Sequence, residues 1–254
     1  MSHDGETLPV HETFEAFQGE GINLGRRSFF VRTYGCDAKC SFCDSAATWH
    51  PDWKPPHVPH RTPFELIDLA HTALKVEVGE RMVPRDGQGR PLWGTGTLLV
   101  LTGGEPTLYN LEPTIAAFRA FGFWTCIETA GHHPLPRNIN HITLSPKVFT
   151  GRLPRPESIE RANEFKIIVE DKNSIPEAMR LLDQYRRMNA PIWLHPEWSK
   201  RNDAEVLRAI CDAVQADPIF RAGFQVHKLY QVDRLAQGSD KRYVPLGGQV
   251  KRGY

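Results

Sequence analysis

Short apolar runs alternate with amphipathic segments along most of this chain. Runs rich in β-branched and aromatic residues, each bounded by glycine, proline or polar turns, predict strands. They fall at residues 28–34, 97–101, 123–129, 141–144, 165–169, 191–195 and 222–227. Apolar positions at helical spacing predict helices at residues 63–76, 113–121, 174–188 and 203–214. The first of these helices opens with a capping box, in which Thr62 precedes Pro63 and Glu65 follows.

The alternation of strands with helices predicts an α/β fold with a parallel sheet and right-handed crossovers. The uninterrupted apolar run Leu98–Leu101 is typical of a strand buried on both faces. Too few helices are present for a closed eight-fold barrel, which favours a partial, open TIM-like barrel in one domain over residues 1–254. Three polar stretches without periodicity interrupt this pattern. They predict a surface insertion with hairpin character at 79–96, a loop at 151–161 and a loosely held C-terminal tail at 234–254.

Composition and charge exclude several classes of function. With 40% hydrophobic and 24% charged residues, the 254-residue chain has the composition of a globular domain with one large core. A formal charge of +1 is no excess of positive charge of the kind that binds nucleic acid or an anionic membrane. No apolar window is long enough to span a bilayer. The polar, acidic start is not a signal peptide, and the odd number of cysteines, five, indicates a reducing cytoplasm.

Three of the cysteines crowd into residues 35–44. Cys36, Cys40 and Cys43 are close enough in sequence to bind one soft metal centre. A structural zinc site needs four ligands, and a disulfide framework needs an even cysteine count in a small secreted chain. An iron–sulfur cluster is held by thiolates, and three of them would leave one iron of a four-iron cluster open. Cys126 and Cys211 are interpreted as small buried hydrophobic residues.

Further polar motifs follow the other predicted strands. Because the carboxyl ends of parallel strands meet at one edge of a sheet, these motifs predict a single site there, together with the cysteines. The motifs are Gly103-Gly104-Glu105-Pro106, Glu128-Thr129, Ser145-Pro146-Lys147 and His195-Pro196-Glu197.

The cysteine spacing, with Phe42 before the third cysteine and Gly-Gly-Glu-Pro after the next strand, resembles the radical S-adenosylmethionine (radical SAM) superfamily. Within it, further motifs resemble the 7-carboxy-7-deazaguanine synthase family. They are Phe17-Gln18-Gly19-Glu20-Gly21, Phe29-Phe30-Val31-Arg32, Cys43-Asp44-Ser45, Ser145-Pro146-Lys147 and Gln225-Val226-His227-Lys228. The resemblance implies a homodimer with a shortened barrel of about six parallel strands and fewer helices.

The resemblance also implies an activity. A radical SAM carbon–nitrogen lyase of this family converts the pterin 6-carboxy-5,6,7,8-tetrahydropterin to 7-carboxy-7-deazaguanine with release of ammonia, in queuosine and deazapurine biosynthesis. It needs a [4Fe-4S] cluster, S-adenosyl-L-methionine, Mg²⁺ and an electron donor such as flavodoxin or ferredoxin. By this resemblance Cys36, Cys40 and Cys43 hold three irons, and S-adenosylmethionine chelates the fourth.

The remaining site residues are carried over in the same way. The cofactor would be contacted by Phe42, Asp44, Gly103, Gly104, Glu105, Ser145, Pro146, Lys147, His195, Pro196, Glu197 and Trp198. The two glycines would let the backbone approach the methionyl amino group, and Glu105 would be a charged acceptor for it. The substrate would be recognised by Phe17, Gln18 and Gly19 at the pterin edge, Thr102, and Arg32 at its carboxylate. Ser45 would ligate Mg²⁺, which prefers oxygen.

Some alternatives stay open at the level of sequence. Glu128 either satisfies neighbouring backbone or contacts the cofactor, and His227 is either a core histidine or a site residue. The chain also departs from the family, which often has Asn at the position of Ala130 and Gln at that of His195. The rival hypotheses are a glycyl-radical-enzyme activase of the same superfamily and a non-enzymatic iron–sulfur or zinc-binding module.

Overall fold

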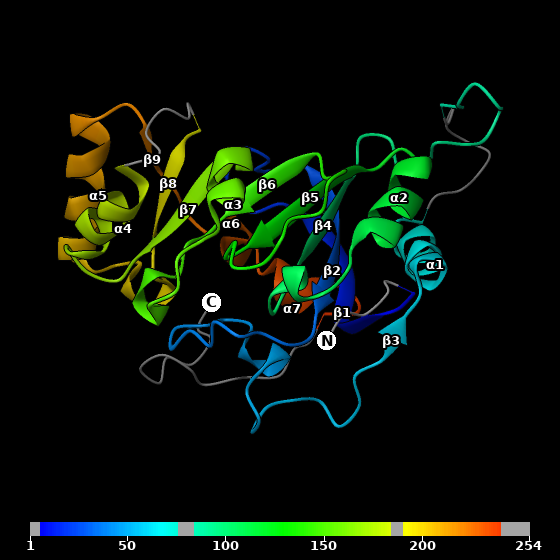
Figure 1. Ribbon diagram of the computed structural model, residues 1–254, viewed down its shortest axis with the longest axis horizontal. Coiled ribbons are helices and arrows are strands. Elements are labelled where there is room, and N and C mark those ends of the chain that lie inside the picture. Colours follow the sequence, from blue (N-terminus) through cyan, green and yellow to red (C-terminus); the bar gives the residue numbers. More distant parts are fainter. Residues whose placement is uncertain (1–5, 76–83, 184–189, 240–254) are drawn as a thin grey trace.

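The computed structural model describes residues 6–75, 84–183 and 190–239, which form one sheet with helices on both sides (Figure 1). The strand order is β3-β1-β2-β4-β5-β6-β7-β8-β9, so the sheet is open, with β3 and β9 at its edges. The parallel part consists of β2 (Arg27–Thr33), β4 (Leu98–Gly103), β5 (Trp124–Thr129), β6 (His141–Leu144), β7 (Glu164–Val169), β8 (Ile192–Pro196) and β9 (Phe220–Ala222). The strands β1 (Leu8–Phe17) and β3 (His60–Arg61) are added antiparallel. The predicted partial, open barrel is confirmed.

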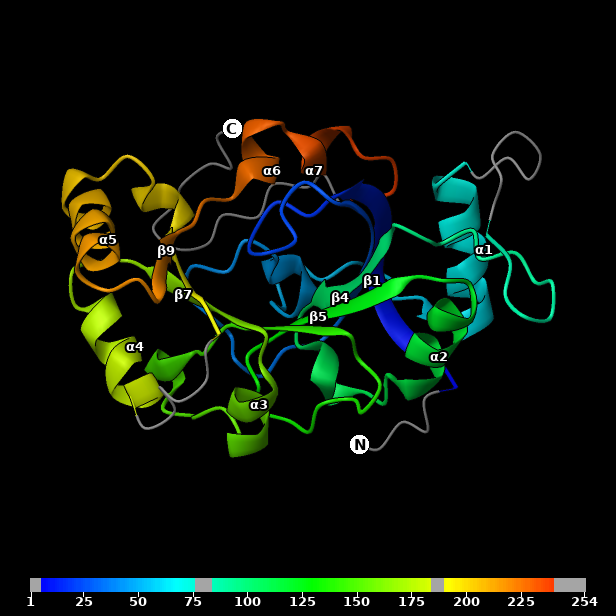
Figure 2. The same cartoon turned by 90° about the horizontal axis from the view of Figure 1, so that it is seen from above.

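Helices flank the sheet on both sides. The longer group is α1 (Pro63–Ala73), α2 (Glu112–Ala120), α3 (Pro156–Arg161), α4 (Ser174–Leu182) and α5 (Ala204–Ala216). The short helices α6 (Val226–Leu229) and α7 (Val232–Leu235) lie across the sheet from α3 (Figure 2). At the start of α1, Thr62 and Glu65 form the predicted reciprocal capping box. Within the described ranges, no helix has the length and apolar character needed to cross a membrane.

The sheet is held by two large apolar cores. One packs strands β1, β2, β4 and β5 against α1 and α2, and the other packs β7 and β8 against α4 and α5. In the central strand β4, all four residues of Leu98–Leu101 are 0% exposed. This confirms the predicted burial on both faces, and it fixes the end of β4 firmly in space.

Several sequence predictions are corrected by the structure. The predicted strand 222–227 is wrong, because β9 ends at Ala222 and residues 226–229 form α6. The loop predicted at 151–161 contains α3. Strand β1 was not predicted, since polar side chains and a register shift between Val10 and Glu12 interrupt its alternation.

The predicted insertion and the ends of two other segments fall partly outside the described residues. Of the insertion at 79–96, residues 84–96 are described, and Arg85 pairs with Pro91 in an isolated antiparallel bridge, as in a small hairpin. The predicted helix 174–188 is described as α4 to Leu182, and residues 184–189 lie outside. In the predicted tail, residues 240–254 lie outside as well.

The cysteine loop, residues 34–45, is locked onto the end of β4. Gly104 N–H donates to Thr33 O at 3.0 Å, and Glu105 N–H donates to Gly35 O at 2.7 Å. A Cβ on Gly104 would lie 1.9 Å from Gly35 O. Gly103 has φ +120°, and a Cβ there would lie 2.4 Å from Thr33 N. The glycine pair therefore has a packing reason, the close approach of two backbones, besides the access to the cofactor that the sequence suggested.

We expect Gly104→Ala to lower the free energy of unfolding by roughly 1–3 kcal/mol, because the new methyl group overlaps the backbone of Gly35. Urea unfolding followed by circular dichroism measures the change. Gly87→Ala is the matched control, since a Cβ at Gly87 meets no atom within 4 Å, and it should change the same quantity by less than about 0.5 kcal/mol. Equal stability of Gly104→Ala and the unmodified chain would contradict this account of the loop.

Candidate active site

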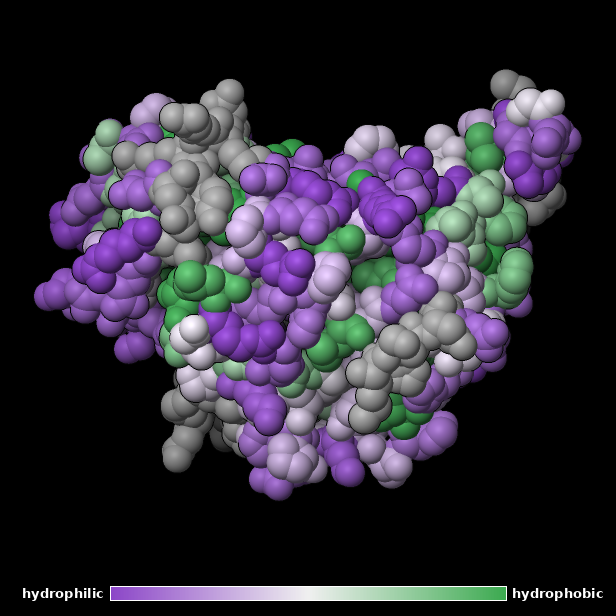
Figure 3. All heavy atoms as spheres, in the orientation of Figure 1, coloured by the Kyte–Doolittle hydropathy of each residue, from purple (hydrophilic) through white to green (hydrophobic). Residues whose placement is uncertain are grey.

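A cavity of about 290 Å³ opens where the carboxyl ends of the parallel strands meet the cysteine loop and α6. All but three of the predicted site residues line it, and the exceptions are Gly19, Pro146 and His195. The molecular face in Figure 3 is mainly hydrophilic, with apolar side chains in separate small patches. The site therefore lies at the sheet edge where parallel α/β folds bind ligands.

The three cysteines of the loop all line this cavity as free thiols. Burial raises the pKa of each thiol, and burial together with Asp44 raises that of Cys43 to about 12. Binding a metal centre would displace these protons, because the thiolate is the ligand. Among the described residues no three His, Cys, Asp or Glu side chains are close enough to hold one metal ion. The soft donor set fits a multi-iron cluster, in which each thiolate binds its own iron.

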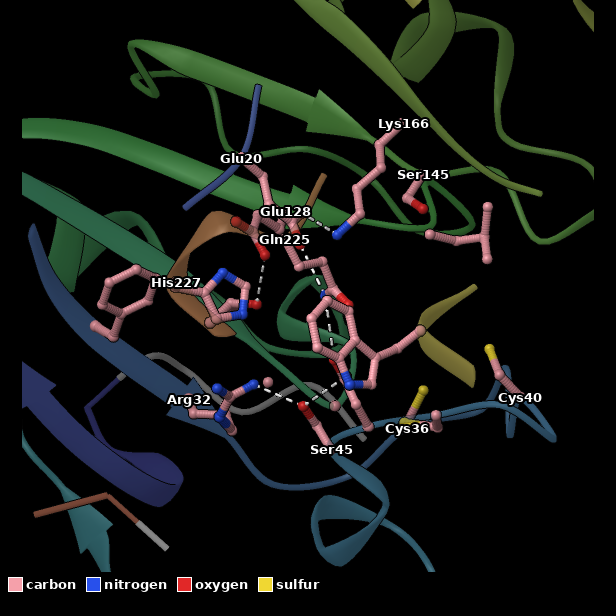
Figure 4. A pocket seen from close by; sticks show the side chains of 18 of the residues that line it. Glu20, Arg32, Cys36, Cys40, Ser45, Glu128, Ser145, Lys166, Gln225 and His227 are labelled. Atoms are coloured by element: carbon pink, nitrogen blue, oxygen red, sulfur yellow. Dashed lines mark hydrogen bonds and ion pairs between the residues drawn. The ribbon is translucent and has the colours of Figure 1, made fainter. Parts of the chain in front are cut away.

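Arg32 and Ser45 meet in the same cavity, with Ser45 between Arg32 and Cys36 (Figure 4). Arg32 Nη1 donates to Ser45 Oγ at 2.7 Å, and Arg32 Nε donates to Glu12 Oε1 at 2.5 Å. The guanidinium carbon also lies 5.8 Å from the centre of the Phe14 ring. Glu12 therefore orients the arginine. Sequence reasoning missed Glu12, because its pairing with Arg32 depends on the unpredicted strand β1.

Glu128 organises two of the predicted substrate residues. Its Oε1 accepts from Gln18 Nε2 at 2.9 Å, and its Oε2 accepts from Thr102 Oγ1 at 3.0 Å. The interpretation in which Glu128 satisfies neighbouring backbone is wrong, since its partners are side chains of β4 and of the turn after β1. Because Gln18 donates through its amide nitrogen, its amide oxygen keeps acceptor capacity.

Glu20 and Lys166 form a buried ion pair in the same cavity. Gln225 Nε2 also donates to Glu20, at 2.8 Å. Burial alone would raise the pKa of Glu20, but the charge of Lys166 outweighs it and the pKa lies below its ordinary value. Burial alone would lower the pKa of Lys166, but Glu20 and Glu128 outweigh it and the pKa is raised. Both groups therefore stay charged near neutral pH.

Neither member of this pair was assigned a role from the sequence. Lys166 could have been found as the one charged residue inside the apolar run of β7, Phe165–Val169. A charge at such a position needs a partner, which indicates a buried ion pair or a site.

Helix α6 closes the cavity from the side opposite the sheet. Lys228 Nζ donates to Asp44 Oδ2 at 2.9 Å and lies 4.8 Å from the centre of the Trp198 ring. His227 is half-buried and lines the cavity, which contradicts its interpretation as a core histidine, and its role in the site stays a prediction. Gly19 packs behind it, where a Cβ would lie 2.1 Å from His227 Nδ1. Gly19 thus makes room for the imidazole and does not line the cavity itself.

The predicted cofactor residues of β4 to β6 are also held by hydrogen bonds. Glu105 is 2% exposed and accepts from Thr129 Oγ1 at 2.6 Å and from Ala130 N at 2.8 Å. It joins the ends of β4 and β5, and its predicted contact with the cofactor stays a prediction. Lys147 Nζ donates to Ser145 Oγ at 2.5 Å, and burial lowers the pKa of Lys147.

His195, predicted to contact the cofactor, is 1% exposed and lies behind the main cavity. Its neighbours on the same strand end, Pro196, Glu197 and Trp198, do line the main cavity. Ile192 and Leu194 pack into the core beside α4 and α5, so Trp193 and His195 point to the opposite face of β8, where His195 lines the smaller cavity.

Comparison with known proteins identifies the family. No family model matches the chain. A 7-carboxy-7-deazaguanine synthase from Synechocystis sp. is 31% identical over 224 residues, which cover 87% of this chain and 92% of the relative. One from Flavobacterium psychrophilum is 30% identical over 228 residues, covering 90% of this chain and 94% of the relative. The crystal structure of QueE from Escherichia coli superposes with a TM-score of 0.67 at 26% identity, covering 87% of this chain and 95% of that one. The chain belongs to the 7-carboxy-7-deazaguanine synthase family.

Proposed function

We propose that this chain is a radical SAM lyase that converts 6-carboxy-5,6,7,8-tetrahydropterin to 7-carboxy-7-deazaguanine with release of ammonia. The observation that carries the proposal is one cavity lined by three free thiols and by an oriented guanidinium. Cys36, Cys40 and Cys43 would hold a [4Fe-4S] cluster with S-adenosylmethionine beside it. Bound together, these groups supply one-electron chemistry that no side chain provides.

The protein's own task is to bind and orient the substrate. Arg32 would pair with the substrate carboxylate through the fork of its guanidinium, which Glu12 already holds in place. Gln18 and Thr102, both fixed by Glu128, would face the pterin edge. Because these groups are oriented before the substrate arrives, little freedom is lost on binding.

The ion pair of Glu20 and Lys166 is suited to recognition. Both groups stay charged near neutral pH, so they present a strong acceptor and a strong donor and do not exchange a proton easily. We propose that they pair with the polar atoms of the pterin ring, with His227 on the facing helix. Their burial strengthens these contacts.

Magnesium binding, dimerisation and the source of electrons are further parts of the proposal. Ser45 Oγ lies within reach of the Asp44 carboxylate, at 3.3 Å, and next to Arg32. An oxygen donor beside the proposed carboxylate site suits Mg²⁺, which shares its shell with substrate oxygens. A homodimer and a flavodoxin or ferredoxin as electron donor remain predictions, as does a cytoplasmic location.

The test is anaerobic reconstitution with iron and sulfide, followed by incubation with reductant, S-adenosylmethionine, carboxytetrahydropterin and Mg²⁺. We expect the ring-contracted product and ammonia in equal amounts, and a lower rate in a parallel sample without Mg²⁺. Accumulation of 5′-deoxyadenosine without that product would show that the substrate is wrong, as for an activase acting on a protein backbone. Absence of both would contradict the radical SAM assignment.

We expect Cys40→Ala to lose the cluster, because removing one of three thiolates leaves too few ligands to hold it. Iron and sulfide content per chain after reconstitution, together with visible absorption, measures the loss without relying on activity. The control is Cys211→Ser, which should keep the full iron content, because Cys211 lies on α5 away from the cavity. The sequence prediction that Cys211 is buried is wrong, since the structure exposes it, whereas Cys126 is buried as predicted. If Cys40→Ala retains about four irons per chain, the cluster assignment fails.

We expect Arg32→Lys to raise the KM for the pterin about 10- to 100-fold, since lysine keeps the charge but loses the forked pair of hydrogen bonds. Steady-state kinetics measure it. Arg27→Lys is the control, because Arg27 pairs with Glu15 outside the cavity, and its KM should change by less than about twofold. Similar KM values for both variants would contradict the proposed pairing of Arg32 with the substrate carboxylate.

A further inference from the structure

A second, smaller cavity lies directly behind the ion pair of Glu20 and Lys166. Its volume is about 10 Å³, which is room for about one water molecule. It shares part of its wall with the main cavity. The residues that line it include Glu20, Glu128, Glu164, Lys166, Trp193 and His195.

Three buried polar atoms in this wall have no hydrogen-bond partner among the described residues. They are both ring nitrogens of His195 and the indole Nε1 of Trp193. Buried polar groups in folded proteins are almost always hydrogen-bonded to protein or to ordered water, so each such atom needs an explanation. Two side chains with unused hydrogen-bonding capacity line one cavity that has room for about one water molecule. They indicate a bound molecule of about that size.

The other polar groups of the wall already have partners. Glu164 accepts from Ile22 N at 2.7 Å and from Thr143 Oγ1 at 2.7 Å, and it contacts His141 at 3.1 Å. Glu128 accepts from Gln18 and Thr102. The missing hydrogen bonds therefore belong to His195 and Trp193. The indole can only donate, so the bound molecule must accept from it, and water can do this while donating to an imidazole nitrogen or a carboxylate.

The chain makes specific room for the imidazole. A Cβ on Gly223 would lie 2.3 Å from His195 Nε2, so only glycine at 223 leaves space for a histidine at 195. Burial lowers the pKa of His195 to about 4, so the ring is neutral near neutral pH. The charged and titratable groups around it are Glu20, Glu164, Lys166 and His227. A neutral ring has one donor and one acceptor nitrogen, and it adds no cation to compete with Lys166 for Glu20.

We propose that one ordered water fills this cavity and links His195 and Trp193 to Glu20, which makes His195 a positioning residue for the substrate site. The existence of the water is independent of the proposed function, while its effect on catalysis rests on that function. The water is a third hydrogen-bond partner of the Glu20 carboxylate, besides Lys166 and Gln225. Glu20 is thereby kept at a fixed angle to the substrate.

The first test is crystallography of the reconstituted enzyme and of three variants, Trp193→Phe, His195→Gln and His195→Leu. We expect one density peak within hydrogen-bond distance of both side chains in the unmodified enzyme. The peak should persist in His195→Gln and vanish in His195→Leu and in Trp193→Phe. An empty cavity in well-ordered density of the unmodified enzyme would overturn the proposal, whatever the enzyme's activity. A bound water in an enzyme that does not convert the pterin would instead overturn the proposed function alone.

The second test is kinetic and uses a double-mutant cycle. We expect His195→Leu and Trp193→Phe each to lower kcat about tenfold, with the KM for the pterin changed less than about twofold. Because both act through one water, the double variant should lose about tenfold and not about a hundredfold. His195→Gln, which keeps a polar partner, should stay within about twofold of the unmodified kcat. Additive losses, or equal losses in His195→Gln and His195→Leu, would overturn the positioning role, and Trp193→Phe decides the case if His195→Leu does not fold.

Discussion

The contact between the cysteine loop and the end of β4 is the constraint on which the site depends. Gly104 and Gly35 bring two backbones closer than any side chain would allow, and two hydrogen bonds hold them there. Because β4 is the most buried strand of the sheet, the loop that is bonded to its end is held in place as well. The thiols are therefore placed relative to the strand ends that carry Thr102 and Glu105. A loop that became ordered only on binding would bind its ligand more weakly, because the ordering costs free energy.

Three cations of the cavity are each paired with a carboxylate before any ligand binds. Arg32 has Glu12, Lys166 has Glu20, and Lys228 has Asp44. An isolated buried charge is strongly unfavourable, so this pairing lets a polar site exist inside the sheet edge. The pairing also restricts the orientation of each side chain. Recognition by such a site depends more on orientation than on net charge.

Sequence reasoning predicted the framework and the chemistry that reside in local patterns. The strand Leu98–Leu101 and the spacing of the three cysteines each lie within a few consecutive residues, so both could be identified directly. The segment Val226–Leu229 was misassigned because an alternating apolar and polar pattern fits a strand as well as a single helical turn. Long-range pairs such as Glu12 with Arg32 were out of reach, since they depend on strand register.

His195 shows why a motif position does not by itself define a role. Its neighbours Pro196 and Glu197 line the main cavity, while the imidazole lines the smaller one, on the same face of the sheet as Lys166. The glycine that admits it, Gly223, is far along the chain and follows β9, so the fit involves two strands at once. A larger residue at 223 would force the ring out of the wall, and the polar atoms beside Glu20 would then be rearranged. The properties of Glu20 thus depend on packing that lies beyond the residues in contact with a ligand.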